Sequence, residues 1–192
     1  MNLKNLTIDQ EWSLFLDRDG VINKRIAGGY VQKWEQFEFL TGVTDAMKIL
    51  SLKFPRIIVV SNQQGIGKGI MTEDDLETIH RKMISEIEKA GGRIDRIYHS
   101  PYREEEGSLI RKPNVGMALM ARKEFSDINF KRSVMAGDSI SDMIFGKRLK
   151  MVNVFISGDI SQARKNHNYI DFIFPDLISF AEAVSVTKKD RN

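Results

Sequence analysis

Short apolar runs alternate with amphipathic stretches along most of this chain. We expect strands at six such runs, which are residues 12–16, 56–60, 94–99, 133–136, 151–156 and 169–174. We expect helices where apolar residues recur at helical spacing, over residues 42–54, 72–90, 113–125, 140–149 and 176–186. Two strands separated by a helix pair in parallel through a crossover. The alternation therefore predicts an α/β fold, a three-layer Rossmann-like parallel sheet with helices on both faces.

The intervals between the strands limit what else the chain can contain. Residues 21–40 hold Gly28 and Gly29 between alternating apolar and aromatic residues, which predicts a small β-hairpin flap. The other intervals are filled by the expected helices and loops, so no room is left for a folded cap domain. We expect one capless domain over residues 1–192, with an open site and a polar tail at 187–192.

The composition narrows the class of protein. Apolar residues make up 42% of the 192 residues, which is enough for one sizeable core, and the net charge of +3 is small. The basic residues are spread among acidic ones, so nucleic acid is not expected as a partner. The chain has no cysteine, which excludes disulfides and thiolate metal sites. No secretory signal and no bilayer-spanning run is present, so we expect a cytoplasmic protein without a membrane partner, and a monomer.

The first expected strand runs directly into two carboxylates and a glycine. Asp17 and Asp19 lie two residues apart and Gly20 follows, in the sequence D-R-D-G. At the end of a strand, both carboxylates can face the crevice at the carboxyl edge of a parallel sheet, where open α/β folds bind ligands. Such a pair can divide nucleophilic attack and proton transfer between its members. Taken alone, the pair could equally end a strand in a solvated turn.

Three later motifs adjoin other expected strands and helices. S-N-Q-Q-G lies at residues 61–65, R-K-P at 111–113 and G-D-S-I-S-D at 137–142. Together with D-R-D-G, they resemble the four motifs of the haloacid dehalogenase-like phosphohydrolases, in the same order and in matching structural contexts. The resemblance implies a phosphatase that works through an aspartyl-phosphate intermediate.

The resemblance also implies catalytic roles. Asp17 would be the nucleophile, and Asp19 would protonate the leaving alcohol and then activate water. Lys112 matches the lysine that bridges nucleophile and phosphoryl group, and Ser61 matches a hydroxyl that donates to a phosphoryl oxygen. An anion attacks another anion readily only where cations intervene, so Mg²⁺ is expected, held by Asp17, the Asp19 carbonyl and Asp138. Hard oxygen ligands favour Mg²⁺ over softer metals.

Other polar residues in these motifs are candidates for binding substrate. They are Asn62, Gln63, Lys68 and Arg111. Arg111 matches a substrate-binding arginine that precedes the motif lysine. The G-I-G-K-G segment at 65–69 lacks the residues of a nucleotide-binding P-loop. It could approach an anionic substrate through Lys68 or simply form a flexible turn before the next helix.

Two residues near the fourth motif are expected to act through their neighbours. Asp142 could complete the surroundings of the metal or hold Lys112, although its spacing from Asp138 also suits a helix start. Ser139 occupies a position that often holds lysine in one group of this family, so the resemblance does not imply the substrate contact that this lysine would make.

Within the family, the motifs most resemble the D-glycero-D-manno-heptose 1,7-bisphosphate phosphatases, with histidinol-phosphate phosphatases as near relatives. The resemblance implies hydrolysis of a small sugar phosphate, above all the 7-phosphate of that bisphosphate. Histidinol phosphate or another small phosphomonoester is the alternative substrate. A phosphate-sensing module without turnover is an alternative from another class, but it would not need both aspartates of D-R-D-G.

In the segment that precedes R-K-P, the sequence of this chain differs from that of the group. The group usually carries a zinc loop of three cysteines and one histidine there, whereas this chain has Ser100, Tyr102, Ser108 and Ile110. His99 alone cannot replace four ligands. We therefore expect no zinc.

Overall fold

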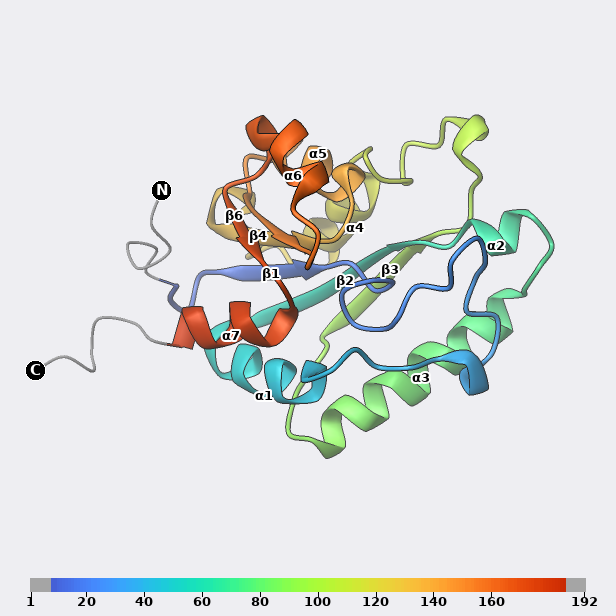
Figure 1. The fold of residues 1–192 in the computed structure, drawn as a ribbon, viewed down its shortest axis with the longest axis horizontal. Helices are drawn as coiled ribbons and strands as arrows, with labels where there is room; N and C mark the ends of the chain where they lie inside the picture. Colours follow the sequence, from blue (N-terminus) through green and yellow to red (C-terminus); the bar gives the residue numbers. More distant parts are fainter. Residues whose placement is uncertain (1–7, 186–192) are drawn as a thin grey trace, which may run out of the picture.

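The computed structural model describes residues 8–185, so the polar tail expected at 187–192 lies outside the described residues. One six-stranded parallel sheet forms its centre, in the order β3-β2-β1-β4-β5-β6 (Figure 1). The strands are β1 Ser13–Leu16, β2 Arg56–Asn62, β3 Arg96–Ser100, β4 Ser133–Gly137, β5 Val152–Ile156 and β6 Phe172–Phe174. The predicted parallel sheet is confirmed. Its last strand begins at residue 172 and not at 169, because residues 167–169 form a 3₁₀ turn.

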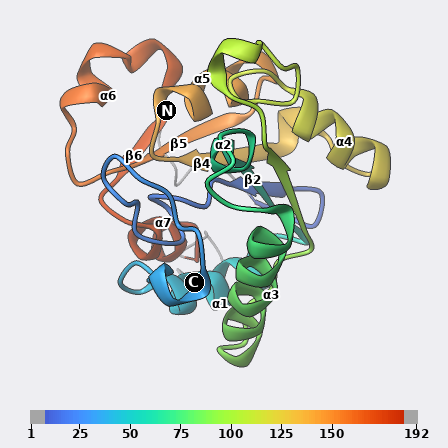
Figure 2. The same cartoon turned by 90° about the vertical axis from the view of Figure 1, so that its right-hand side faces the viewer.

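Helices cover both faces of the sheet. They are α1 Val43–Lys53, α2 Gln64–Gly67, α3 Glu73–Lys89, α4 Gly116–Glu124, α5 Ile140–Arg148, α6 Ser161–Lys165 and α7 Leu177–Ser185. Figures 1 and 2 show α1, α3 and α7 on one face and α4, α5 and α6 on the other, which confirms the three layers. The short helices α2 and α6 were not predicted, and α4 begins three residues later than expected. None of the helices in the described part of the chain combines the length and apolarity that crossing a bilayer requires.

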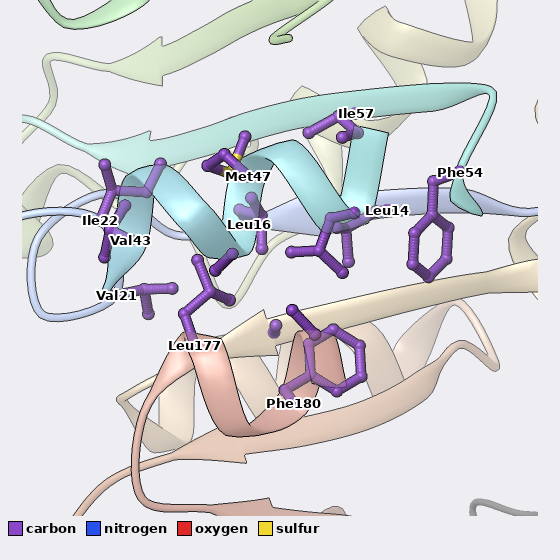
Figure 3. Close-up of a cluster of buried hydrophobic side chains, with 14 of the residues drawn as sticks. Leu14, Leu16, Val21, Ile22, Val43, Met47, Phe54, Ile57, Leu177 and Phe180 are labelled. Carbon is purple, nitrogen blue, oxygen red and sulfur yellow. The ribbon is translucent and has the colours of Figure 1, made fainter. Parts of the chain in front are cut away.

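The alternation of side chains along β1 explains why both faces need a helical layer. Leu14 and Leu16 pack on the side of α1 and α7, with Met47 and Phe180 among their neighbours (Figure 3). Phe15, between them, belongs to the core on the opposite face. Because successive side chains of a strand point to opposite faces, the three consecutive apolar residues of β1 are buried on both sides of the sheet. β1 is therefore held firmly, and so is the position of the residues that follow it.

Helix α3 begins at a capping box, where the sequence predicted the helix to start. The Thr72 hydroxyl accepts a hydrogen bond from the Asp75 backbone N–H at 3.1 Å, and the Asp75 carboxylate accepts one from the Thr72 backbone N–H at 2.8 Å. These bonds satisfy N–H groups that have no partner inside the helix. The cap fixes where the buried face of α3 starts, and His80 lies on that face.

The flap expected at residues 21–40 folds back on itself but forms only one antiparallel bridge, between Asn23 and Phe39. The predicted β-hairpin is therefore much reduced. The aromatic residues that suggested a strand pack on one another: Trp34 stacks on Phe37 with ring centroids 4.9 Å apart, and Phe37 meets Phe39 edge-on at 5.0 Å. A 3₁₀ turn over Trp34–Gln36 interrupts the extended backbone. We call residues 21–40 the flap loop.

The sheet order places a crevice at the carboxyl ends of the central strands. β1 pairs with β2 on one side and with β4 on the other, so the chain leaves β1 and β4 towards opposite halves of the sheet. Ligands of open α/β folds bind at such a reversal of strand order. Figure 2 looks onto this edge, with α2 and the flap loop in front of the sheet.

Candidate active site

A cavity of about 390 Å³ opens at this carboxyl edge. The predicted site residues that line it are Asp17, Asp19, Ser61, Asn62, Gln63, Arg111, Lys112 and Ser139. The flap loop contributes Arg25 and Tyr30 to the same wall. Lys68, Asp138 and Asp142 do not line the cavity, but Asp138 and Asp142 contact residues that do. The fold thus gathers residues from all four motifs at one place.

Lys112 is a buried cation that contacts three oxygen atoms of the site. Its Nζ atom lies 2.8 Å from Asp17 Oδ1, 2.6 Å from Asp142 Oδ1 and 2.7 Å from the Val60 carbonyl oxygen, and its side chain is 2% exposed. Burial alone would lower the pKa of Lys112, but the charges of Asp142 and Asp17 outweigh it and hold that pKa above its ordinary value. The ammonium group is therefore charged at neutral pH and fixed against the Asp17 carboxylate.

Asp17 is buried and faces the cavity at the end of β1. Its Oδ1 atom also accepts a hydrogen bond from the Arg18 backbone N–H at 2.8 Å. Burial raises the pKa of Asp17 to about 6, although Lys112 opposes the rise. Above that pH the carboxylate is ionised, which is the form that a nucleophile needs.

Asp19 accepts hydrogen bonds from three side chains. Arg18 Nη2 lies 3.0 and 2.9 Å from the two carboxylate oxygens, Asn23 Nδ2 lies 3.0 Å from Oδ1, and Gln63 Nε2 lies 2.8 Å from Oδ2. Although burial opposes the charge, the Arg18 charge and these bonds hold the pKa of Asp19 below its ordinary value. The arrangement favours the ionised carboxylate, which is the form that accepts a proton from water.

The fourth motif brings a third carboxylate to the cavity edge. Asp138 Oδ1 lies 2.7 Å from Arg25 Nη2, which is also 3.0 Å from the Asp19 carbonyl oxygen and 3.9 Å from Asp17 Oδ2. Burial raises the pKa of Asp138 to about 7, with Asp17 adding to the rise and Arg25 opposing it. The guanidinium group thus provides positive charge where three oxygens converge.

Carboxylate and carbonyl oxygens at the cavity edge could bind a hard cation. One oxygen each from Asp17, Asp138 and Asp142 lies within 4.8 Å of the others. Asp142 is already engaged, because Lys112 contacts one of its oxygens and Ser139 the other. The Asp17 and Asp138 carboxylates and the Asp19 carbonyl are therefore the better set, and their chemistry fits Mg²⁺.

Asp142 fulfils two of the roles that the sequence left open. It contacts Lys112, and its Oδ2 accepts hydrogen bonds from the Ser139 hydroxyl at 2.6 Å and the Ser139 backbone N–H at 3.1 Å. The bond from the Ser139 backbone N–H, together with one of 3.4 Å that the Ser139 hydroxyl accepts from the Asp142 backbone N–H, forms the capping box of α5. One carboxylate therefore starts the helix and orients the site lysine.

Gly20 is needed for the approach of Asp138. Its φ is +97°, and a Cβ built there would lie 1.9 Å from Asp138 Oδ2. Any side chain would therefore displace the carboxylate.

Two residues predicted to bind substrate hold candidate catalytic residues in place. Asn62 Nδ2 donates to the Lys112 carbonyl at 3.0 Å, and the Lys112 N–H donates to Asn62 Oδ1 at 2.9 Å. Gln63 Nε2 donates to the Ser61 hydroxyl at 2.7 Å and to Asp19. Both amides have their hydrogen bonds inside the protein, so these contacts indicate a positioning role.

The other two predicted substrate contacts differ in position. Arg111 lines the cavity and donates from Nη1 to the Tyr102 carbonyl at 3.2 Å. Lys68 donates from Nζ to the Tyr30 hydroxyl at 2.9 Å and is absent from the cavity wall. Arg111 can therefore contact a substrate in the cavity, whereas the Lys68 ammonium group, which lies outside the cavity wall, is hydrogen-bonded to Tyr30.

Hydrogen bonds hold the loop before R-K-P, for which the sequence predicts no zinc site. A 3₁₀ turn over Glu104–Glu106 is closed by a bond of 2.7 Å from the Arg103 N–H to the Glu106 carboxylate. Asn114 Nδ2 donates to the Ser108 carbonyl at 3.0 Å and ties the loop to the residues after it. The absence of zinc stays a prediction.

Sequence reasoning missed two residues in or beside the site, Arg18 and His80. Arg18 lies between the two aspartates, where its fully buried side chain could not be foreseen from its type. His80 stands on the apolar stripe of α3 with Leu76 and Met83, so helical spacing could have identified it as buried. The contacts of Arg25 with Asp138 and the Asp19 carbonyl depend on the path of the flap loop, which sequence spacing does not give.

Known proteins resemble this chain over most of its length. The family described as Polynucleotide kinase 3 phosphatase matches residues 14–187. The D-glycero-alpha-D-manno-heptose-1,7-bisphosphate 7-phosphatase of Mycobacterium bovis is 34% identical over 181 residues, which cover 94% of this chain and 95% of that protein. The D-glycero-beta-D-manno-heptose-1,7-bisphosphate 7-phosphatase of Helicobacter pylori is 37% identical over 142 residues, covering 73% and 80% of the two chains.

A solved structure has the same fold. It is that of the D,D-heptose 1,7-bisphosphate phosphatase from B. bronchiseptica complexed with magnesium and phosphate, with a TM-score of 0.79 and 23% sequence identity. The alignment covers 88% of this chain and 96% of that one. At this identity the likeness concerns the fold alone.

Proposed function

The chain belongs to the polynucleotide kinase 3 phosphatase family of haloacid dehalogenase-like phosphatases, and we propose from this premise that it removes the 7-phosphate of D-glycero-D-manno-heptose 1,7-bisphosphate. The enzyme is a phosphoric monoester hydrolase. Relatives named for this substrate support the proposal, and because both alpha and beta forms occur among their names, we leave the anomer open. The single domain, the monomeric state and the cytoplasmic location stay predictions.

The contact between Lys112 and Asp17, beside the ionised Asp19, is the observation that carries the proposal. An Asp17 oxygen bonds to phosphorus while the bond from phosphorus to the sugar oxygen breaks, and that oxygen takes a proton from Asp19. Water then gives a proton to Asp19 and bonds to phosphorus, and the bond to Asp17 breaks and releases phosphate. The Ser61 hydroxyl and the Lys112 ammonium group would donate hydrogen bonds to phosphoryl oxygens.

Asp19 has to be protonated when the sugar oxygen leaves, although its present contacts favour the ionised form. In this scheme, the approach of the anionic phosphoryl group raises the pKa of Asp19, because a like charge disfavours the ionised carboxylate. The same contacts then suit the second step, in which Asp19 accepts a proton.

Asp17, the Asp19 carbonyl and Asp138 would hold Mg²⁺. When bound, the metal would supply positive charge between the nucleophile and the phosphoryl oxygens. The position of the Arg25 guanidinium against these oxygens supports the assignment, since it stands in for a cation there.

Arg111 is the candidate for recognising the second phosphate. It lines the cavity from the R-K-P motif, and a guanidinium group can donate two parallel hydrogen bonds to a phosphate. Charged hydrogen bonds of this kind are worth roughly 1.5 to 3 kcal/mol, or about one to two orders of magnitude in a rate ratio.

The test is a panel of phosphate esters assayed with Mg²⁺. We expect kcat/KM for heptose 1,7-bisphosphate to exceed that for heptose 7-phosphate and histidinol phosphate by at least about tenfold. Arg111→Ala should shrink this ratio, whereas Arg164→Ala, which removes an exposed arginine outside the cavity wall, should preserve it. Faster hydrolysis of histidinol phosphate would contradict the proposed substrate, and absence of hydrolysis of every ester would contradict the proposed enzyme.

A further inference from the structure

The buried Arg18 links the candidate catalytic carboxylate to helix α3. Its side chain is 1% exposed, and Nη2 lies between the two Asp19 oxygens at 3.0 and 2.9 Å. The same nitrogen lies 3.2 Å from Gln63 Oε1, and the Gln63 amide donates to Asp19. Two of the three groups that hold Asp19 therefore depend on where the Arg18 guanidinium stands.

His80 is the partner of Nη1, the second terminal nitrogen of the Arg18 guanidinium. Its Nε2 atom lies 3.2 Å from Arg18 Nη1, across 62 residues of sequence. A guanidinium group can only donate, so Nε2 accepts and the imidazole is neutral with its proton on Nδ1. Burial, together with the Arg18 charge, lowers the pKa of His80 to about 3, which agrees with the neutral ring.

Nη2 is held only by Asp19 and Gln63, the groups that it positions, so within the described residues His80 is the one other anchor of the guanidinium. Among the described residues, Nε of Arg18 is buried without a hydrogen-bond partner, and His80 is the hydrogen-bond partner of Nη1. If the imidazole were lost, the guanidinium could rotate about its stem and carry Nη2 away from Asp19. A buried, charged donor left without a partner gains by such a movement.

We propose that His80 is a positioning residue for hydrolysis, which aligns the Asp19 carboxylate by fixing the Arg18 guanidinium. The inference rests on the proposed function, because the alignment matters for turnover only if Asp19 transfers the proton. His80 itself touches neither of the two catalytic aspartates in any contact of the described structure.

Three variants test the proposal by hydrolysis of heptose 1,7-bisphosphate with Mg²⁺. His80→Leu removes the acceptor, His80→Gln keeps an acceptor at similar reach, and His99→Leu is the control. The His99 ring lies 6.2 Å from that of His80, and His99 pairs with Glu73, so it shares the surroundings without holding Arg18.

His80→Leu should lower kcat by roughly ten- to a hundredfold, because misplacement of a catalytic group by about 1 Å has an effect of that size. KM should stay within about twofold of the wild-type value. His80→Gln should recover most of kcat, and His99→Leu should resemble the wild type. Wild-type kcat in His80→Leu, or a His80→Gln variant as slow as His80→Leu, overturns the proposal.

A measurement without turnover separates this proposal from the proposed function. The ¹⁵N signals of the Arg18 guanidinium report its environment by NMR in the wild type and in each variant. We expect them to shift in His80→Leu and to return towards wild type in His80→Gln. If the wild type hydrolyses no ester, the proposed function fails, and unchanged Arg18 signals in both variants would still refute the positioning. If His80→Leu does not fold, the same comparison is made with His80→Asn, whose shorter side chain should not reach Nη1.

Discussion

Replacing Lys112 with methionine should destabilise the protein, even though the replacement keeps most of the side-chain volume. The ammonium group is buried with two carboxylates, Asp17 and Asp142, and with the Val60 carbonyl, all within 2.8 Å. Removing one partner from a buried ionic cluster leaves uncompensated charge and typically costs about 3 to 5 kcal/mol. For a chain of this length, we expect a decrease in Tm on the order of 10 °C.

The size of this loss should depend on pH. Burial already raises the pKa of Asp17 to about 6, and without Lys112, which lowers it, the pKa of Asp17 should rise further. At pH 5 the carboxyl group of the variant then folds as the neutral acid, whereas at pH 8 a buried group that resists ionisation opposes folding. The destabilisation by Lys112→Met should therefore be larger at pH 8 than at pH 5.

Urea unfolding followed by circular dichroism at both pH values measures these differences. Lys123→Met, at an exposed lysine of α4, is the matched control and should change stability little. The double variant Lys112→Met/Asp142→Asn should recover part of the lost stability, because one unpaired carboxylate is gone, but no activity. A loss below about 1 kcal/mol, or a loss that is equal at both pH values, would refute the reasoning, since breaking a buried pair should cost more.

Three further outcomes are expected. Asp17→Asn should abolish turnover and formation of the phosphoenzyme while leaving the fold intact, because an amide cannot form the acyl phosphate; steady-state turnover in that variant would contradict the nucleophile assignment. EDTA should inactivate the enzyme, Mg²⁺ should restore it, and Asp138→Ala should weaken the rescue, whereas elemental analysis that finds stoichiometric zinc would contradict the predicted absence of a zinc loop. The metal-free protein should be more stable at pH 5 than at pH 8, as measured by chemical unfolding in EDTA. Burial raises the pKa of Asp17 to about 6 and that of Asp138 to about 7 in the folded protein. A carboxyl group whose pKa is raised by folding stabilises the folded state fully below the unfolded pKa of 3.8, and this contribution is lost as the pH rises through the folded-state pKa. His80, whose pKa is lowered to about 3 by burial, opposes this trend up to about pH 6.5, but it is one group against two. Equal stability at the two pH values would therefore contradict the raised carboxyl pKa values.

The sequence by itself determined the class of fold and the four motifs that meet at the candidate site. Apolar runs separated by helical patterns predicted the parallel sheet, and residues that follow parallel strands must meet at one edge. Asp17 and Asp138 therefore had to lie at the same edge of the sheet, and the pairing of β1 with β4 in the structure makes them neighbours. The cap at Thr72 was also predictable, because its two hydrogen bonds join residues only three apart.

Only the tertiary structure decided how the site residues pair. The contact of Lys112 with Asp17, and that of Arg18 with His80, joins residues far apart in the sequence, and periodicity gives the face of an element without giving its partner across a loop. The place of Arg25 follows from a flap loop in which aromatic residues packed together and left a single bridge of the expected hairpin. Such contacts depend on the packing of side chains from several segments at once, because a buried charge is stable only where the whole fold supplies its partners.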